Sequence, residues 1–477
     1  MITNRRTHLA GLAALGLSGL APAQAEGPGP FAGLWSAVFL DDETGLASRV
    51  RLDIAPDGKV TVTFVDLANV PWPASSVGFD PPSIVIEWNA IGLAFTGRLA
   101  GPDTIVGRPT GAAIDKPKDQ TFSRGDRFVV DATVLPHGLM DPDRLHRLRQ
   151  ISGAPALGVA WAFKNQADHV LTDGLRSSEA DVAVSPTDRW HIGSCTKSMT
   201  ATLAARLVSA GRLQWTTTIG EVLGPVVRDI HPAYREANLL HLFSHHAGLM
   251  RDPPGANTFS HGKRVAVHAE RVLYAERLLR EPPLGPIGTT NIYSNGGFVV
   301  AGLMLEVIAG QLYENLMQEQ VFAPLGLASA GFGPPAADHG RSSALGHGRG
   351  ADGTLHPVTA IKLAENPPPC ANPCGGVHIG LGDYLTYLKA HRDHPASFLP
   401  EAAWKTLQIP PFGGPTALGW GVGPDGTLQH AGSNGLWWAQ VSINPWGVVF
   451  AGVQNATTPS AISVMAQAQD AIARSWD

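Results

Sequence analysis

The chain has 477 residues, of which 44% are hydrophobic and 16% charged, so it is long enough for two domains with a large buried core. The formal net charge of −5 at pH 7 comes without any basic run, which argues against nucleic acid as a partner. The 54 glycines and 38 prolines lie mostly between apolar segments, as in a loop-rich enzyme.

Residues 1–25 have the pattern of a cleaved export signal. Arg5-Arg6 forms a basic start, residues 9–21 are apolar, and Ala23-Gln24-Ala25 is a small-residue cleavage site. The apolar stretch is shorter than the roughly 20 residues that a membrane anchor needs. We therefore expect a periplasmic or secreted protein with no integral membrane segment in the mature chain. General secretory and twin-arginine export both stay open.

Residues 26–132 alternate short β-like runs with turns such as Asp57-Gly58, which predicts a small antiparallel β-sandwich or barrel. The runs are 35–40, 50–54, 60–65, 83–88, 93–99 and 127–130. Because this segment holds no cluster of catalytic residue types, we expect an accessory domain that docks or stabilises.

Residues 140–477 mix helix and strand patterns, which predicts an α+β domain. The expected helices are 144–151, 194–210, 293–309, 313–318, 384–391 and 461–475. The expected strands are 156–163, 169–172, 427–432, 436–443 and 448–453. Strands near both ends, with helices between them, indicate a sheet that joins the two ends of the domain.

Ser194 and Lys197 lie at the start of the helix predicted at 194–210, on one face of it. The helix N-terminus adds partial positive charge, and a buried amine that loses its own charge can accept the serine proton. Gly193 allows a tight turn into the helix, and the apolar residues after Lys197 indicate burial. The alternative is an ordinary helix start with a capping serine and an exposed lysine.

Cys195 is the rival nucleophile. It lies about 100° around the helix from Ser194, so the two side chains cannot share one site. Since cysteine is commonly a small buried hydrophobe, we expect it to pack rather than react.

Two further motifs carry groups for acyl transfer. Tyr293, held between positive groups, can act as a phenolate or proton shuttle, and Asn295 can hold the lysine and a substrate amide. The alternative there is a helix N-cap with a core tyrosine. His430 could project into a cleft from its strand, where Gly432 leaves room for substrate. The backbone N–H groups of Ser433 and Ser194 form a candidate oxyanion hole.

No metal site is expected. His241, His245 and His246 include an i, i+4 pair, but no acidic ligand is close in the sequence, which favours structural roles. Cys370 and Cys374 can either close a small disulfide in an oxidising compartment or stay free in a tight turn.

Taken in order, these motifs resemble the serine β-lactamase and penicillin-binding-protein superfamily. The branch is that of class C β-lactamases, DD-peptidases, D-aminopeptidases and family VIII esterases. The resemblance is carried by residues 192–198, 293–295 and 430–432, with support from 242–249, 324–327 and 418–422. It covers residues 140–477 and implies a β-lactamase/transpeptidase-like domain, in which helices flank an antiparallel sheet.

The resemblance also implies roles. Ser194 would be the acylated nucleophile, Lys197 its base, Tyr293 the proton shuttle to the leaving group and Asn295 the holder of lysine and substrate. Class C β-lactamases carry a lysine where this chain has His430, the electrostatic group of the third motif. Histidine is mostly neutral near pH 7 and attracts a substrate carboxylate weakly, so efficient β-lactam hydrolysis is not expected.

The sequence therefore predicts an exported serine hydrolase that forms a covalent acyl-enzyme and needs no metal or organic cofactor. Its substrate would be a small molecule or peptide, either a D-amino peptide or a carboxylic ester. The alternatives are a β-lactamase and a penicillin-binding receptor or adaptor without turnover. The intact motifs argue against an inactive adaptor, and the oligomeric state stays open.

Overall fold

A computed structural model describes residues 27–40, 47–64, 71–89, 92–111, 117–126, 128, 140–259, 266–336, 342–359 and 366–473. The expected export signal at 1–25 and most of the expected strand at 127–130 lie outside these residues. The chain divides into two compact units, of which the first holds most residues up to Val129 and the second holds Val130–Asp477.

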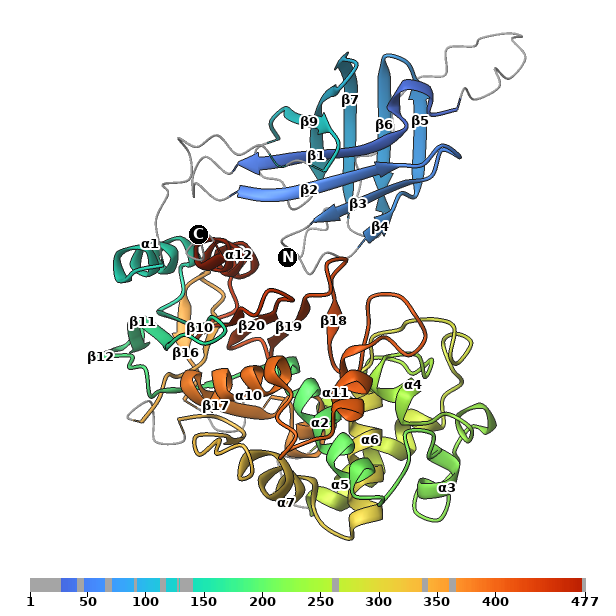
Figure 1. The fold of residues 1–477 in the computed structure, drawn as a ribbon, viewed down its shortest axis with the longest axis vertical. Helices are drawn as coiled ribbons and strands as arrows, with labels where there is room; N and C mark the ends of the chain where they lie inside the picture. Colours follow the sequence, from blue (N-terminus) through green and yellow to red (C-terminus); the bar gives the residue numbers. More distant parts are fainter. Residues whose placement is uncertain are drawn as a thin grey trace, which may run out of the picture. The chain divides into compact units, whose positions relative to one another are not determined.

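The N-terminal unit is one nine-stranded sheet, with the order β4-β3-β2-β1-β9-β8-β7-β6-β5 (Figure 1). Its strands are β1 Gly33–Leu40, β2 Ala47–Ile54, β3 Val60–Phe64, β4 Pro71–Pro73, β5 Ser76–Asp80, β6 Ser83–Trp88, β7 Leu93–Gly101, β8 Thr104–Gly111 and β9 Gln120–Arg124. Strands β4 and β5 are the two edges, yet only Ala74 and Ser75 separate them. The sheet must therefore curl until its edges approach, which favours the barrel over the two-sheet sandwich.

Side-chain alternation explains why these residues form strands. In β6, Ile84, Ile86 and Trp88 are buried while the residues between them are exposed, as the two-residue period of a half-buried strand requires. Four strands were not expected from the sequence: β4, β5, β8 and β9. Strand β8 contains Gly107 and Pro109, residue types that normally mark turns rather than strands.

The second unit is built on a seven-stranded antiparallel sheet, with the order β12-β11-β10-β21-β20-β19-β18. Its strands are β10 Ala156–Ala162, β11 Asp168–Ser177, β12 Ala180–Ala183, β18 Gly421–Val422, β19 Leu428–Ser433, β20 Trp438–Ile443 and β21 Val449–Gln454. The first strand of the unit pairs with the last, with Leu157 opposite Gln454. The expectation that the sheet joins the two ends of the domain is confirmed.

Helices cover both faces of this sheet. On one face lie α1 Pro142–Ser152 and α12 Ala461–Ala473 (Figure 1), which share one buried apolar cluster with Leu157, Val159 and Trp161 of β10. The intervening residues of β10 face the larger core on the other side, which contains the remaining long helices. These are α2 Thr196–Ser209, α5 Val267–Leu279, α6 Asn295–Ala309 and α10 Leu381–Asp393.

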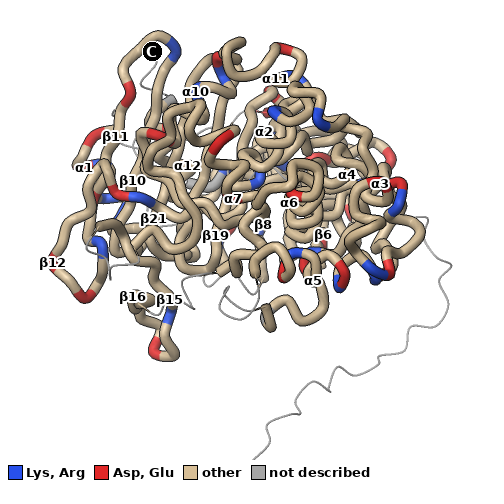
Figure 2. Tube along the Cα trace, turned by 90° about the horizontal axis from the view of Figure 1, so that it is seen from below, with Lys and Arg blue, Asp and Glu red and all other residues tan. Residues whose placement is uncertain are grey.

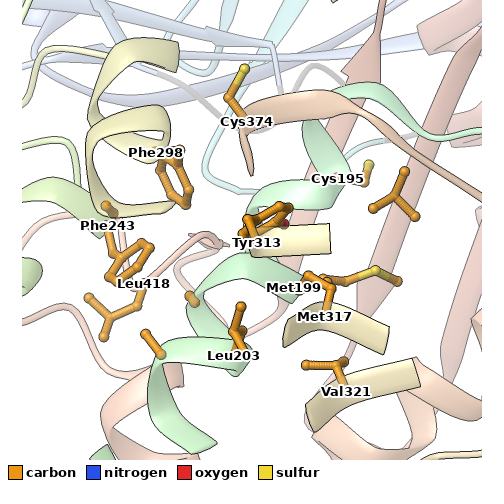
Figure 3. Packing of buried hydrophobic residues seen from close by; sticks show 14 of the residues in the cluster. Cys195, Met199, Leu203, Phe243, Phe298, Tyr313, Met317, Val321, Cys374 and Leu418 are labelled. Carbon is orange, nitrogen blue, oxygen red and sulfur yellow. The ribbon is translucent and has the colours of Figure 1, made fainter. Parts of the chain in front are cut away.

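Shorter elements complete this unit. They are α3 Ile219–Leu223, α4 Leu239–Phe243, α7 Tyr313–Met317, α9 Asn372–Gly375, α11 Glu401–Gln408, the hairpin β15 His347–Arg349 with β16 Leu355–Pro357, and a small sheet of β13 Arg189–His191, β17 Val377–Gly380 and β14 Gly331–Phe332. Helix α2 lies at the centre of the core, where Met199 and Leu203 are surrounded by residues such as Phe298 (Figure 3).

Charged residues are spread along the trace, with Lys and Arg interspersed among Asp and Glu (Figure 2). Among the described residues no single helix has the length and apolar composition needed to cross a membrane. The pair Asn295–Ala309 and Tyr313–Phe322 meets those criteria only jointly, and it is bent by 84°.

Candidate active site

Ser194 lies in a tight turn between β13 and α2. The turn is a 3-10 helix, η3 Gly193–Cys195, so α2 itself begins at Thr196 rather than at Ser194 as the sequence pattern predicted. Gly193 has a φ of +50°, and a Cβ there would come within 2.5 Å of the Ser433 nitrogen. Only glycine fits this backbone without strain or a clash.

Lys197 reaches Ser194 from the first turn of α2. Its Nζ lies 3.1 Å from Ser194 Oγ, 2.9 Å from Asn295 Oδ1 and 2.7 Å from the Cys374 carbonyl oxygen, and the residue is fully buried. A neutral amine has two N–H groups and one lone pair. When the N–H groups bind Asn295 and Cys374, the lone pair faces Ser194 and can accept its proton.

Asp252 joins the site although the sequence did not single it out. Its carboxylate accepts hydrogen bonds from Asn295 Nδ2, at 3.2 and 3.3 Å, and from the Tyr274 hydroxyl at 3.0 Å. Burial raises the pKa of Tyr274, so its hydroxyl stays protonated and donates. This arrangement fixes the Asn295 amide with its oxygen toward Lys197. The only hint in the sequence is that Asp252 follows the segment 242–249 closely.

Tyr293 lies at the same site but outside the predicted helix. Helix α6 begins at Asn295, because the Ser294 side chain caps it by accepting from the Gly297 N–H. The Tyr293 side chain is 38% exposed, so it is not a core tyrosine. Lys197 Nζ lies 5.0 Å from the centre of its ring and the Arg251 guanidinium 5.8 Å, so two basic side chains lie near the ring.

His245 supports Tyr293 from behind. The two ring centres are 4.4 Å apart, and His245 Nδ1 accepts a hydrogen bond of 3.1 Å from the Ser294 N–H. Burial, with the nearby Lys197 and His430, holds the pKa of His245 well below its usual value. The imidazole is therefore neutral, as its acceptor role requires.

The three histidines of 241–246 have separate structural contacts. His241 Nδ1 accepts from the Asn238 N–H within a helix cap, and His246 Nδ1 bonds to Ser244. Across the described part of the chain, no group of three or more His, Cys, Asp or Glu side chains could hold a metal ion.

Strand β19 passes directly beside the Ser194 turn. A Cβ on Gly432 would lie 2.1 Å from the Ile192 oxygen and 2.7 Å from the Ser194 nitrogen. Together with the contact between Gly193 and Ser433, this brings the Ser194 and Ser433 nitrogens to adjacent segments. The structure thus places the two expected oxyanion-hole donors next to each other.

His430 is half-buried on this strand. Its Nδ1 lies 2.8 Å from the Ala431 carbonyl oxygen and must donate to it, which leaves Nε2 without a proton in the neutral ring. Burial lowers the pKa of His430 to about 4. The third motif therefore contributes a neutral imidazole above about pH 5.

The three cysteines are free and buried. Burial raises the pKa of Cys195 to about 12, and its side chain packs in the core around α2 (Figure 3). Of the two possibilities for Cys370 and Cys374, the structure has the free thiols. Cys374 instead contributes its backbone carbonyl oxygen to the site.

Comparison with known proteins gives consistent matches over the second unit. A family model described as "Beta-lactamase" matches residues 147–473. The chain is similar to penicillin-binding protein 4 of Amycolatopsis lactamdurans, with 28% identity over 253 residues, which is 53% of this chain and 63% of that protein.

Two solved structures illustrate the shared fold. EstCE1, a hydrolase with promiscuous acyltransferase activity, aligns with a TM-score of 0.59 and 18% identity over 69% of this chain and 97% of its own. The D-amino acid amidase of Ochrobactrum anthropi aligns with a TM-score of 0.55 and 18% identity over 70% and 95%. The family match spans well over half of the chain, and the fold agrees with it. The chain belongs to the β-lactamase family, and it spans less than two thirds of the length of the curated relatives it matches first.

Proposed function

We propose that the protein is a serine hydrolase that forms a covalent acyl-enzyme on Ser194 and cleaves an amide or ester. The observation that carries this proposal is the contact of 3.1 Å between Lys197 Nζ and Ser194 Oγ, with the other two bonds of the amine directed away from the serine. A buried amine in this position is the base that a weak serine nucleophile needs.

The proposed reaction has two stages. Lys197 takes the proton of Ser194 as Oγ attacks the substrate carbonyl, and the N–H groups of Ser194 and Ser433 stabilise the resulting oxyanion. Collapse breaks the bond to the leaving group, which receives a proton through Tyr293. Water then attacks the ester on Ser194 and gives a proton to the same basic groups, which return it to Ser194 Oγ as the acid leaves.

The third motif favours D-amino peptides or carboxylic esters over β-lactams as substrates. His430 is neutral, so it attracts a substrate carboxylate less than a lysine ammonium would. Similarity to a D-amino acid amidase supports a D-amino substrate, and similarity to EstCE1, a hydrolase with promiscuous acyltransferase activity, supports acyl transfer. A penicillin receptor without turnover is the alternative from another class, and kinetics separates the two.

Residues 1–25 support a further proposal, that the chain is exported and that residues 26–132 act as an accessory domain. The mass of the protein purified from culture tests the export step. Processed protein should begin at Glu26, whereas a retained N-terminal segment would contradict it.

The experiment that tests the reaction is the intact mass of the protein after mixing with benzylpenicillin and, separately, with p-nitrophenyl butyrate. Each adduct is then mapped to a peptide. We expect a butyryl adduct on the peptide that contains Ser194 and release of p-nitrophenolate. Because Cys195 lies on the same peptide, fragment ions or a Cys195→Ala control must assign the residue. Hydrolysed penicillin would indicate a β-lactamase, and a stable penicillin adduct without ester turnover would indicate a receptor. An adduct on Cys195 would overturn the proposed nucleophile.

A further inference from the structure

One hydrogen-bond acceptor of Lys197, the Cys374 carbonyl, belongs to a segment whose own secondary structure is too short to fix its position. The segment Pro369–Gly375 consists of one 3-10 turn, η7 Pro369–Ala371, and the single turn α9 Asn372–Gly375. Helices this short are marginal by themselves. The place of the carbonyl must therefore be set by neighbouring elements.

Arg271 of α5 anchors the beginning of the segment. Its Nε donates to the Cys370 carbonyl at 2.9 Å and its Nη2 to the Pro369 carbonyl at 3.1 Å. The Arg271 side chain is fully buried, and its charge is balanced by ion pairs with Glu306 and, at 2.8 Å, with Glu314. A buried guanidinium is costly unless it is paired in this way, so its bonds to the two carbonyls are well defined.

Glu314 provides a second anchor for the 369–375 segment. Its Oε1 accepts from Asn372 Nδ2 at 2.8 Å, in addition to the bond from Arg271. One carboxylate thus links the arginine to the turn that ends at Cys374.

Thr200 anchors the segment from the side of the lysine. It lies three residues after Lys197 on α2 and is fully buried. Its Oγ1 donates to the Pro373 carbonyl at 2.7 Å, and the Tyr313 hydroxyl lies 2.7 Å away. Residues three apart share a helix face, so α2 carries the Lys197 amine and also binds the 369–375 segment, which supplies the Cys374 carbonyl.

We infer that Arg271 and Thr200 are positioning residues, which fix the Cys374 carbonyl so that the lone pair of Lys197 points at Ser194. The inference rests on the proposed function, because it assigns them a task only if Lys197 is the base. If the carbonyl moves, one N–H of the amine loses its acceptor, and the lone pair no longer has a single direction.

A matched pair of threonines on α2 tests this. Thr202 is as buried as Thr200 and also contacts a tyrosine hydroxyl, that of Tyr387 at 3.1 Å. Its other contacts are the Ser198 carbonyl and His391, none of which belongs to the 369–375 segment. Thr200→Val and Thr202→Val should therefore lose similar stability, while only the former releases the carbonyl.

The measurement is the burst of p-nitrophenolate from p-nitrophenyl butyrate, which reports acylation directly. We expect Thr200→Val to lower the acylation rate by about tenfold or more with KM within about twofold, and Thr202→Val to stay within about threefold of the wild type. A purely structural role would lower the acylation rate to a similar extent in both threonine variants.

Asn372→Ala provides a second variant that leaves α2 unchanged, and it should lower acylation in the same direction. Equal acylation rates in Thr200→Val, Asn372→Ala and Thr202→Val would overturn the inference. Ser194→Ala, measured in parallel, distinguishes failure of the inference from failure of the proposed function. If the three variants have equal rates and Ser194→Ala is inactive, only the positioning role has failed. If Ser194→Ala is fully active, the proposed function itself has failed.

Discussion

The cores of the two units differ in how many polar side chains they bury. Among the described residues of the N-terminal unit, the buried polar side chains are Ser36 and Thr63, in a core of residues such as Trp35 and Ile84. The second unit buries charged residues, including Lys197, and a set of histidines. Because burying a charge or an unpaired polar group costs several kcal/mol, such groups persist only where partners or function hold them. The contrast supports the proposal that the reaction takes place in the second unit.

The same contrast appears in the buried histidines. Burial lowers the pKa of His191 and of His391 to about 3, and that of His378 and of His430 to about 4. Residues 26–132, by comparison, contain no histidine at all. The two units should therefore respond differently to acid as well as to mutation.

The largest expected effect comes from Ser194→Ala. Removing the nucleophile should lower turnover of p-nitrophenyl butyrate by at least ~10³, since only binding and the oxyanion-hole donors are left. Thermal unfolding should change little, because the side chain lies at a half-buried turn. Steady-state kinetics checks this, and a mutant within tenfold of the wild type would mean that the polar core serves something other than this reaction.

Asp252→Leu should have the next largest effect. Without the carboxylate, the Asn295 amide can turn its NH₂ group toward Lys197 and compete for the lone pair that faces Ser194. We expect kcat/KM to fall by roughly tenfold to a hundredfold. Asp252→Asn is the control, because its amide oxygen can still accept from Asn295 and should retain most of the activity. Similar losses of kcat/KM in both variants would instead show that the negative charge of Asp252, rather than its hydrogen bonds to Asn295, supports activity.

Acid should destabilise the second unit before the first. A histidine whose pKa is lowered in the folded state binds a proton more readily when unfolded, so its contribution is complete above about pH 6.5 and is lost as the pH falls toward 4. Each such residue contributes about 1.4 kcal/mol per pH unit over that range. Hydrogen exchange at pH 7 and pH 5, each corrected for the intrinsic exchange rate at that pH, should show a lower protection factor at pH 5 in peptides covering β10 but not in those covering β6. Loss of protection in the β6 peptides before the β10 peptides would contradict the expected difference in acid stability between the two units.

The smallest effect is expected from Cys195→Ala. The thiol is buried and protonated, so its loss should leave acylation within about threefold of the wild type and cost about 1 kcal/mol of stability through packing. Loss of acylation in a folded protein would show that the thiol takes part in the chemistry.

Much of the site was predictable because its motifs are local. Ser194 and Lys197 are neighbours on one turn, and Asn295 follows Tyr293 closely, so the 3.6-residue period and helix capping already place them. Helix starts were less predictable. The pattern predicted helices from Ser194 and Tyr293, whereas a 3-10 turn and a serine cap delay both. Backbone capping at such ends depends on bonds that periodicity does not encode.

Partners distant in the sequence were not predictable. The Cys374 carbonyl lies 177 residues from Lys197, and any residue type can supply a carbonyl, so the sequence gives no signal for it. Neither Asp252 nor Arg271 stands out in the sequence. Their roles depend on the fold, which brings Asp252 to Asn295 and buries Arg271. Strand β8 was missed for a different reason, because its glycine and proline resemble turn signals.

By itself, the sequence determined the order of the main helices and strands around the site, the proposed pairing of Ser194 with Lys197, and the family that the motifs resemble, because these depend on spacing within one or two turns of chain. Only the tertiary structure decided which acceptors direct Lys197, how Asn295 is oriented and that burial lowers the pKa of His430 to about 4. Those properties depend on burial and on hydrogen bonds between residues far apart in the chain, and both arise only when the sheet and its helices pack together.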